Sequence, residues 1–385
     1  MDVEAFRKSP CGRVIPTTQG AWAFVPDPLP PVLGLGPLVD VVADANGYLG
    51  ELRGLGRQLT NPYLLVRPLS RKEALSSSSI EGTHTTMTEL LSFEAGIEHP
   101  ARHDDNKEVS NYIRALDRGI ELLKELPICN RLICEVHREL LGGLPASRRR
   151  GGEPGSFKRD QNWIDGSQND SSQARFVPPP PTESEHAMGA LEKFINDPDR
   201  LRIQPLVFLA LVHYQFEAIH PFPDGNGRVG RILIPLLLHS KKLLPQPLLY
   251  MSPYFEANKD EYIERMYNVS LTGDWHEWIG FFLKGVIESS KSAIGTIQNL
   301  MNLHAQYVER IHRVRASAKL IRFVDLLFDR PVVSIPRVQT LLGVTYRAAM
   351  LNTNRLVREG ILSELPGTRR PKFYIAREIL NIIDW

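Results

Sequence analysis

The chain has 385 residues, of which 42% are hydrophobic and 23% are charged, a balance that is typical of a globular protein with two or three structural units. Its net charge of +2 at pH 7 predicts neither a nucleic-acid partner nor a membrane partner. Three irregularly spaced cysteines, Cys11, Cys129 and Cys134, argue against a disulfide framework and against a zinc site. No apolar run reaches the length of a membrane span, so we expect a cytoplasmic protein that does not enter a membrane.

The spacing of apolar residues predicts helices over most of the chain. Before the middle of the chain we expect them at 32–59, at 64–91 with a break at 76–83, at 106–125 and at 128–141. After it we expect them at 183–196, 204–219, 228–242, 259–271, 275–289 and 292–312. The helix at 228–242 carries Ile and Leu on more than one face, which predicts that it is the buried central helix.

The segment 148–181 interrupts these helices with glycines, prolines and polar residues. Two short extended pieces, Trp163-Ile164 and Phe176-Val177, flank the turn-rich residues 165–170, a pattern that predicts a β-hairpin. The prolines at 178–181 end any strand pairing.

The last seventy residues, 316–385, have a different pattern. Helices at 319–328, 335–342 and 347–359 precede two extended pieces, 361–365 and 372–375, which resembles the order of a winged helix. Eleven lysines and arginines against six acidic residues give this unit a net charge of +5. A contact with DNA phosphates is favoured by its basic residues Arg337, Arg347, Arg355, Arg358, Arg369, Arg370 and Lys372. Such modules also bind proteins, and both alternatives stay open.

One loop between two helices carries the chemistry. At His220-Pro221 the proline forces its predecessor out of the helical region, and Phe222 can anchor the loop in the core. Gly225, Asn226 and Gly227 then allow backbone N–H groups to converge just before a helix that begins near residue 228. Amides that converge at a helix N-terminus form an anion site, and phosphate is its usual ligand.

Three charged side chains and a histidine complete this loop. Arg228 and Arg231 are three residues apart on the first helical turn, so both can grip a polyphosphate. Asp224 is placed to hold a divalent cation, with Mg²⁺ the expected cofactor. His220 can accept a proton from a hydroxyl near pH 7. The loop therefore predicts transfer of a phosphorus group without a covalent enzyme intermediate.

The stretch HPFPDGNGRVGR, residues 220–231, resembles the signature HPFx[D/E]GNGRxxR of the Fic (filamentation induced by cAMP) family at every fixed position. The resemblance implies that His220 is the general base and Asp224 the magnesium ligand. It also implies that the loop from Gly225 to Arg231, Gly230 included, binds ATP and places Arg228 and Arg231 on the β- and γ-phosphates. AMP would pass to a Ser, Thr or Tyr hydroxyl of a protein target or of the chain itself, so the family activity is that of a protein adenylyltransferase.

The same resemblance implies a mainly α fold, a Fic-type helical bundle with a β-hairpin flap and a C-terminal winged helix. We expect a helical region at 1–105, a catalytic core at 106–290, a connecting helix at 291–315 and a winged-helix-like unit at 316–385. In the flap, Gln161, Asn162, Trp163 and Ile164 would dock the target by strand addition.

Further residues around the loop have expected roles. Tyr262 resembles the aromatic residue that lines the adenine pocket of the family. His213 and Glu217 are four residues apart on a helix, so we expect them to touch and to orient the loop from behind.

A second motif lies upstream of the loop. Ser77 to Gly82 fits the pattern [S/T]xxxE[G/N] of self-inhibited Fic proteins, in the class whose inhibitory helix precedes the core. The resemblance implies that Glu81, at the edge of the ATP site, takes the guanidinium of Arg231 that the γ-phosphate needs. In some relatives this glutamate also positions water to remove AMP.

Two other functions remain open at this stage. One is a DNA-binding transcriptional regulator in which the Fic part is a sensor. The other is a Fic enzyme that transfers UMP, phosphate or phosphocholine, although the paired arginines favour AMP. The helical N-terminal region is also compatible with a homodimer.

Overall fold

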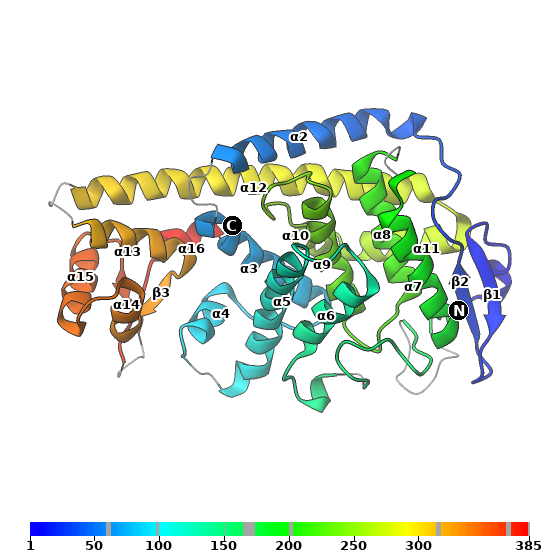
Figure 1. The fold of residues 1–385 in the computed structure, drawn as a ribbon, viewed down its shortest axis with the longest axis horizontal. Coiled ribbons are helices and arrows are strands. Elements are labelled where there is room, and N and C mark those ends of the chain that lie inside the picture. The colour runs from blue at the N-terminus through cyan, green and yellow to red at the C-terminus, as the bar shows by residue number, and fades with distance from the viewer. Residues whose placement is uncertain are drawn as a thin grey trace.

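The computed structural model describes residues 1–58, 63–97, 100–149, 151–164, 174–199, 203–312, 317–366 and 371–383. The fold is mainly helical with small antiparallel sheets, so the predicted fold class is confirmed (Figure 1). No helix among these residues is both long enough and apolar enough to cross a membrane.

The N-terminus forms a small unit that the sequence analysis does not predict. After the short helix α1 (Val3–Phe6), strands β1 (Gly12–Pro16) and β2 (Trp22–Pro26) pair antiparallel. The rings of Phe6 and Phe24 pack with Phe176, which belongs to the second of the two extended pieces, or arms, of the expected flap. The N-terminal strands thus form one wall behind the flap, at the right of Figure 1.

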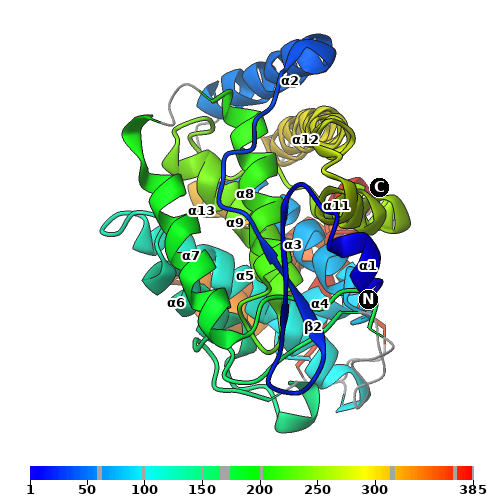
Figure 2. The ribbon, with the colours of Figure 1, turned by 90° about the vertical axis from the view of Figure 1, so that its right-hand side faces the viewer.

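Two long helices run along one side of the molecule (Figures 1 and 2). They are α2 (Val39–Gln58) and α12 (Trp275–His312). Two helices are predicted at 275–289 and 292–312, and this division is wrong, because α12 is one uninterrupted helix of 38 residues. No glycine or proline lies at 290–291 to end it, and Ser290 is buried.

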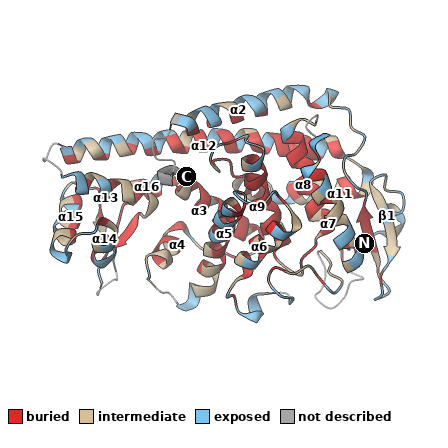
Figure 3. Ribbon diagram, in the orientation of Figure 1, coloured by how far each residue is buried: buried red, intermediate tan, exposed pale blue. Residues whose placement is uncertain are grey.

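The catalytic loop lies between α8 (Pro205–Ile219) and α9 (Asn226–Ser240), which form the centre of the core (Figure 3). Almost every residue of α9 is buried, which confirms it as the predicted central helix. Around this pair lie α5 (His103–Leu122), α6 (Asn130–Leu141), α7 (Pro181–Asn196), α10 (Ser252–Ala257) and α11 (Lys259–Thr272). Short 3-10 turns η1 (Gly36–Leu38), η2 (Pro100–Arg102) and η3 (Ala146–Arg148) connect some of these elements.

Helix α3 (Tyr63–Ile80) continues through the serines where a break is expected from residue 76. Ser76, Ser77 and Ser78 are buried, so tertiary packing overrides their weak helix propensity. The break comes at Gly82, whose φ of +89° suits glycine, and α4 (Met87–Glu94) follows. The N–H of Gly82 bonds the Ser79 carbonyl and the N–H of Thr83 bonds the Ser78 carbonyl, which closes the helix end.

The C-terminal unit contains α13 (Ala318–Asp329), β3 (Val332–Ser334), α14 (Ile335–Leu342), α15 (Tyr346–Arg358), β4 (Ser363–Glu364), β5 (Phe373–Ile375) and α16 (Arg377–Ile383). The strands form a sheet in the order β3-β5-β4. Helices α13 and α16 contact α3, so this unit touches the helix that carries Glu81. Its assignment as a winged helix and its DNA contact remain predictions, and Arg369 and Arg370 lie outside the described residues.

Candidate active site

The loop after α8 is held in an unusual backbone conformation. His220 has φ of +49° and ψ of 60°, a left-handed conformation that is uncommon outside glycine. Two bonds of 2.8 Å join the Asn226 side chain to the N–H and the carbonyl of Phe222. Phe222 is fully buried, as expected of an anchor. The side chain of Asn226 therefore closes the loop, and only its backbone N–H remains available for the predicted anion site.

Two side chains from the flap arm fasten the same loop. Lys158 donates to the carbonyls of His220, at 2.9 Å, and of Ile219, at 3.4 Å. Asn162 donates to the carbonyls of His220, at 3.1 Å, and of Phe222, at 2.9 Å. Burial lowers the pKa of Lys158 to about 7, and only 2% of this residue is exposed. Lys158 is thus a positioning residue that the sequence analysis does not identify.

His137 supports the loop from the other side. Its ring stacks on Phe222 with centroids 3.8 Å apart. Its Nδ1 accepts from the N–H of Gly155 at 2.8 Å, so Nε2 carries the proton that it donates to the Asp224 carbonyl at 3.1 Å. Burial lowers the pKa of His137 to about 4, which keeps the ring neutral. No pattern in the sequence predicts a role for this histidine.

The side chain of His220 is oriented by a backbone group. Its Nδ1 lies 3.3 Å from the carbonyl oxygen of Glu217. Because a carbonyl only accepts, Nδ1 carries the proton in this contact, and Nε2 is the nitrogen suited to take a proton. This tautomer is the one that the predicted general base requires.

The predicted contact between Glu81 and Arg231 is present. Oε1 of Glu81 accepts from Arg231 at 2.7 Å, and Ser77 accepts from the same guanidinium through Oγ, at 2.8 Å, and through its carbonyl, at 3.0 Å. A Cβ on Gly227 would overlap Oε1 of Glu81, so the carboxylate lies against the glycine loop. Burial would raise the pKa of Glu81, but the nearby cations, with Arg231 first, outweigh burial and lower it.

Arg228 has a carboxylate partner from another helix. Its guanidinium lies 3.2 Å from Oε2 of Glu108, which also accepts from the Thr83 hydroxyl at 2.7 Å. Both side chains of this ion pair are almost fully buried. Glu108 is a further residue of the site that the sequence analysis does not identify, because no local spacing links α5 to the loop.

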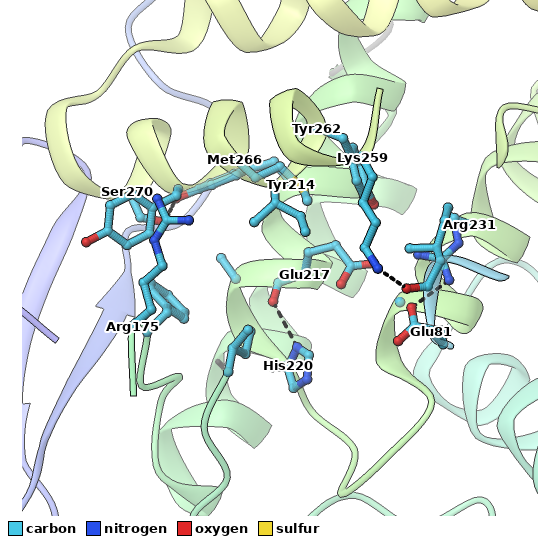
Figure 4. Close-up of a pocket in the computed structure, with 17 residues that line it drawn as sticks. Glu81, Arg175, Tyr214, Glu217, His220, Arg231, Lys259, Tyr262, Met266 and Ser270 are labelled. Atoms are coloured by element: carbon cyan, nitrogen blue, oxygen red, sulfur yellow. Dashed lines mark hydrogen bonds and ion pairs between the residues drawn. The ribbon is translucent and has the colours of Figure 1, made fainter. Parts of the chain in front are cut away.

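Two cavities meet at the loop. An apolar cavity of about 260 Å³ lies under α11 and is bordered by Ile80, Tyr214, Tyr262, Ile263 and Met266, among others (Figure 4). A polar cavity of about 890 Å³ lies on the other side and is bordered by Gly82, Asp224, Gly225, Asn226 and Arg228, among others. Glu81, His220 and Gly227 border both cavities. A ligand with an apolar ring and a charged tail could therefore occupy both, with its junction beside His220.

Tyr262 borders the apolar cavity, as expected of the residue proposed to line the adenine pocket. Its ring stacks on Phe255 with centroids 4.4 Å apart, and its hydroxyl lies 2.8 Å from Nε2 of His213. The Nδ1 of His213 lies 3.1 Å from the Gly230 carbonyl. His213 therefore lies behind the loop as expected, but its hydrogen-bond partners are Tyr262 and Gly230.

Glu217 also borders the apolar cavity, and its Oε1 is buried without a hydrogen-bond partner. Burial raises the pKa of Glu217 to about 7. A Cβ on Gly230 would overlap this oxygen, so Gly230 makes room for the carboxyl. Gly230 itself borders neither cavity.

The two arms of the expected flap are joined by one antiparallel bridge between Ile164 and Phe176. The connecting residues 165–173 lie outside the described residues. Ile164 borders the apolar cavity, and Gln161, Asn162 and Trp163 border the polar one. All four predicted flap residues thus lie beside the loop.

Asp224 is the residue predicted to hold Mg²⁺. Within the described part of the chain, no group of three or more His, Cys, Asp or Glu side chains is arranged to hold a metal ion. Mg²⁺ is often bound by one or two carboxylates together with substrate phosphates, and Asp224 borders the polar cavity beside the glycine loop. The residues present therefore fit a Mg²⁺ ion that arrives with a polyphosphate.

Two family models match this chain, Fic/DOC family N-terminal at residues 39–121 and Fic/DOC family at residues 127–238, and together they cover about half of the chain. The solved structure of a Fic family protein from Desulfovibrio desulfuricans is similar over 90% of this chain and 98% of its own, with a TM-score of 0.57 at 20% identity. The solved structure of a Fic domain containing signaling protein from Bacteroides thetaiotaomicron is similar over 67% of this chain and 98% of its own, with a TM-score of 0.52 at 22% identity. The chain belongs to the Fic/DOC family.

A curated relative, protein adenylyltransferase Fic of Drosophila melanogaster, is 27% identical over 165 residues. The match covers 42% of this chain and 31% of the relative, so the similarity spans about a third of the relative's length.

Proposed function

We propose that the protein is a Mg²⁺-dependent adenylyltransferase that moves AMP from ATP to a hydroxyl group of a protein. The observation that carries the proposal is the position of His220 and Gly227, which border both the apolar and the polar cavity. Adenosine suits the apolar cavity beside Tyr262, and the phosphates suit the amides and Arg228 of the polar one. Arg231 borders the apolar cavity together with Glu81 and Gly227, which also border the polar one. The name of the curated relatives supports the same activity.

In the proposed reaction, Nε2 of His220 takes the proton of the acceptor hydroxyl. The hydroxyl oxygen bonds to the α-phosphorus of ATP, the bond from that phosphorus to the β-bridging oxygen breaks, and pyrophosphate leaves. Arg228, Arg231 and the loop amides stabilise the charge that develops on the phosphates. Mg²⁺ would be held by Asp224, and when bound it neutralises phosphate charge.

We further propose that Glu81 restrains this activity. Its carboxylate bonds Arg231 and lies against Gly227, where the terminal phosphates of ATP would bind. A nucleotide and this carboxylate compete for the same guanidinium, and a displacement of about 1 Å is enough to spoil in-line attack. Removal of the carboxylate should release the activity.

The test is automodification of the full chain with ATP labelled at the α-phosphate. Glu81→Gly should raise labelling roughly fivefold or more, because a charge-assisted hydrogen bond is lost. Glu51→Gly is a matched control at an exposed glutamate on α2 and should not raise labelling.

His220→Ala, made in the Glu81→Gly background, should lower labelling roughly 10²- to 10⁴-fold while ATP binding persists. Retained labelling would overturn the assigned base. Unchanged labelling in Glu81→Gly would refute the restraint, and label from the γ-phosphate in place of the α-phosphate would refute transfer of AMP.

A further inference from the structure

A third cavity, of about 450 Å³, lies far from the catalytic loop, between the helical body and the C-terminal unit. Helices α3, α4 and α5 form one side, and α13, β3 and α14 form the other. Its charged residues are Arg67, Arg71, Glu94, Arg114, Asp117, Asp329, Arg330 and Arg337. The residues of the proposed active site do not border it.

Arginines outnumber carboxylates around this cavity. Three of the five arginines form ion pairs with carboxylates. These pairs are Arg67 with Asp117 at 2.6 Å, Arg71 with Glu94 at 2.8 Å and Arg330 with Asp329 at 3.2 Å. The remaining two, Arg114 and Arg337, are exposed and form no ion pair with a carboxylate among the described residues. The cavity therefore carries two positive charges without a carboxylate partner.

A buried donor adds a second observation. Only 5% of Arg71 is exposed, and while its Nε and NH2 groups donate to Glu94, its NH1 group is buried with no hydrogen-bond partner among the described residues. A buried donor that lacks a partner destabilises the fold, so an arrangement of this kind favours a ligand that brings acceptor oxygens.

We propose that this cavity binds a phosphate-bearing small molecule. Guanidinium groups bind phosphate oxygens in forked pairs, and the two arginines without a carboxylate partner supply the compensating charge. The volume lies within the range of small-molecule sites, which often form between domains. The ligand would bridge Arg71 and Arg114 of the helical body to Arg330 and Arg337 of the C-terminal unit.

The position of Arg71 gives the site a consequence for the loop. Arg71 and Ser77 belong to the same helix, α3, and Glu81 follows directly after its last residue. A ligand that fixes α3 to α13 and α14 would fix the helix that presents Glu81 to Arg231. This coupling rests on the proposed function of Glu81, whereas ligand binding does not.

The binding test uses isothermal titration calorimetry of the full chain with inorganic pyrophosphate. The double variant Arg114→Ala/Arg337→Ala removes the two arginines that have no carboxylate partner, and both are exposed, so folding should persist. The double variant Arg118→Ala/Arg322→Ala is the matched control, with one exposed arginine on α5 and one on α13 outside the cavity. The catalytic loop is unchanged in all three proteins, so any pyrophosphate that binds there contributes equally to the three titrations.

In the wild type and in the control, we expect one class of sites with the same affinity for pyrophosphate. In the Arg114→Ala/Arg337→Ala variant, the affinity of this class should fall by at least about tenfold. Identical titrations for all three proteins would overturn the proposal. Amide hydrogen exchange measures the coupling without ATP: pyrophosphate should slow exchange in α3 of the wild type and the control only. Binding that leaves α3 unchanged would overturn the coupling, and neither result depends on adenylyl transfer.

Discussion

The C-terminal end and the N-terminal half of α3 lie in surroundings of different charge. At the C-terminal end, one carboxylate, Glu81, meets the buried guanidinium of Arg231. In the N-terminal half, Arg67 and Arg71 border a cavity that contains five arginines and three carboxylates. The first region has an anion that belongs to the chain, and the second has positive charge that the chain itself does not balance. Under the two proposals, an anion at the loop would release Glu81, and an anion in the cavity would fix α3.

The largest change is expected at the catalytic end, where Lys259 donates to the carbonyl of Ile80, the last residue of α3, at 2.6 Å. Lys259→Ala removes this bond and should let Glu81 leave Arg231 more often. Loss of a bond worth about 0.5–1 kcal/mol predicts automodification about two- to fivefold above the wild type, below the level of Glu81→Gly. The measurement is labelling at saturating ATP, because Lys259 also borders the apolar cavity.

Lys284→Ala, at an exposed lysine of α12, is the control for this experiment. Labelling of Lys259→Ala at or below the level of the control would show that this bond does not hold Glu81 in place.

A second carboxyl at the catalytic end sharpens the contrast, because Glu217 forms no ion pair among the described residues and the charge of Arg231 offsets its burial only in part. Burial raises its pKa to about 7 in the folded protein, above the usual value near 4.5. The folded state therefore holds a proton that the unfolded state has lost, and stability falls as pH rises from about 5 to above 7. Glu217→Gln removes this cost, so its Tm should exceed that of the wild type by roughly 2 °C at pH 8 and by little at pH 5.

Thermal unfolding at the two pH values measures the effect of Glu217→Gln. A difference in Tm that is the same at pH 5 and pH 8 would contradict the raised pKa.

The smallest effect is expected at the cavity beside Arg67 and Arg71 of α3. Arg337→Glu brings a fourth carboxylate into a cavity in which arginines outnumber carboxylates, beside arginines on both walls. An exposed ion pair is worth about 0–1 kcal/mol, so Tm should rise by about 1 °C at low salt and by less at high salt. Arg322→Glu, on the outer side of α13, is the control. A fall in Tm for Arg337→Glu alone would show that the cavity is not short of negative charge.

The catalytic loop could be predicted because its chemistry is contiguous in the sequence. His220, Asp224 and Arg231 are close along the chain, and the motif from Ser77 to Gly82 is also local. The structure places Glu81 on Arg231 and Tyr262 at the apolar cavity, as expected. In each case the prediction depended on the residue type and on the residues next to it in the sequence.

The residues that support the loop could not be found in this way. Lys158 and His137 act on backbone carbonyls of a distant segment, and such contacts leave no pattern of residue types. Glu108 reaches Arg228 across 120 positions of the chain. The same reason explains the missed N-terminal hairpin, whose strands gain their packing partner Phe176 only in the folded protein.

The continuity of α12 has a practical consequence for dissecting the protein. At about 1.5 Å per residue, its 38 residues form a rod roughly 57 Å long that serves both the catalytic body and the C-terminal unit. A chain shortened at residue 290 would end in the middle of this rod and would lose Ile294, Ile297 and Leu300, which are buried in the intact chain. Pieces of this protein should therefore be divided after His312, where α12 ends.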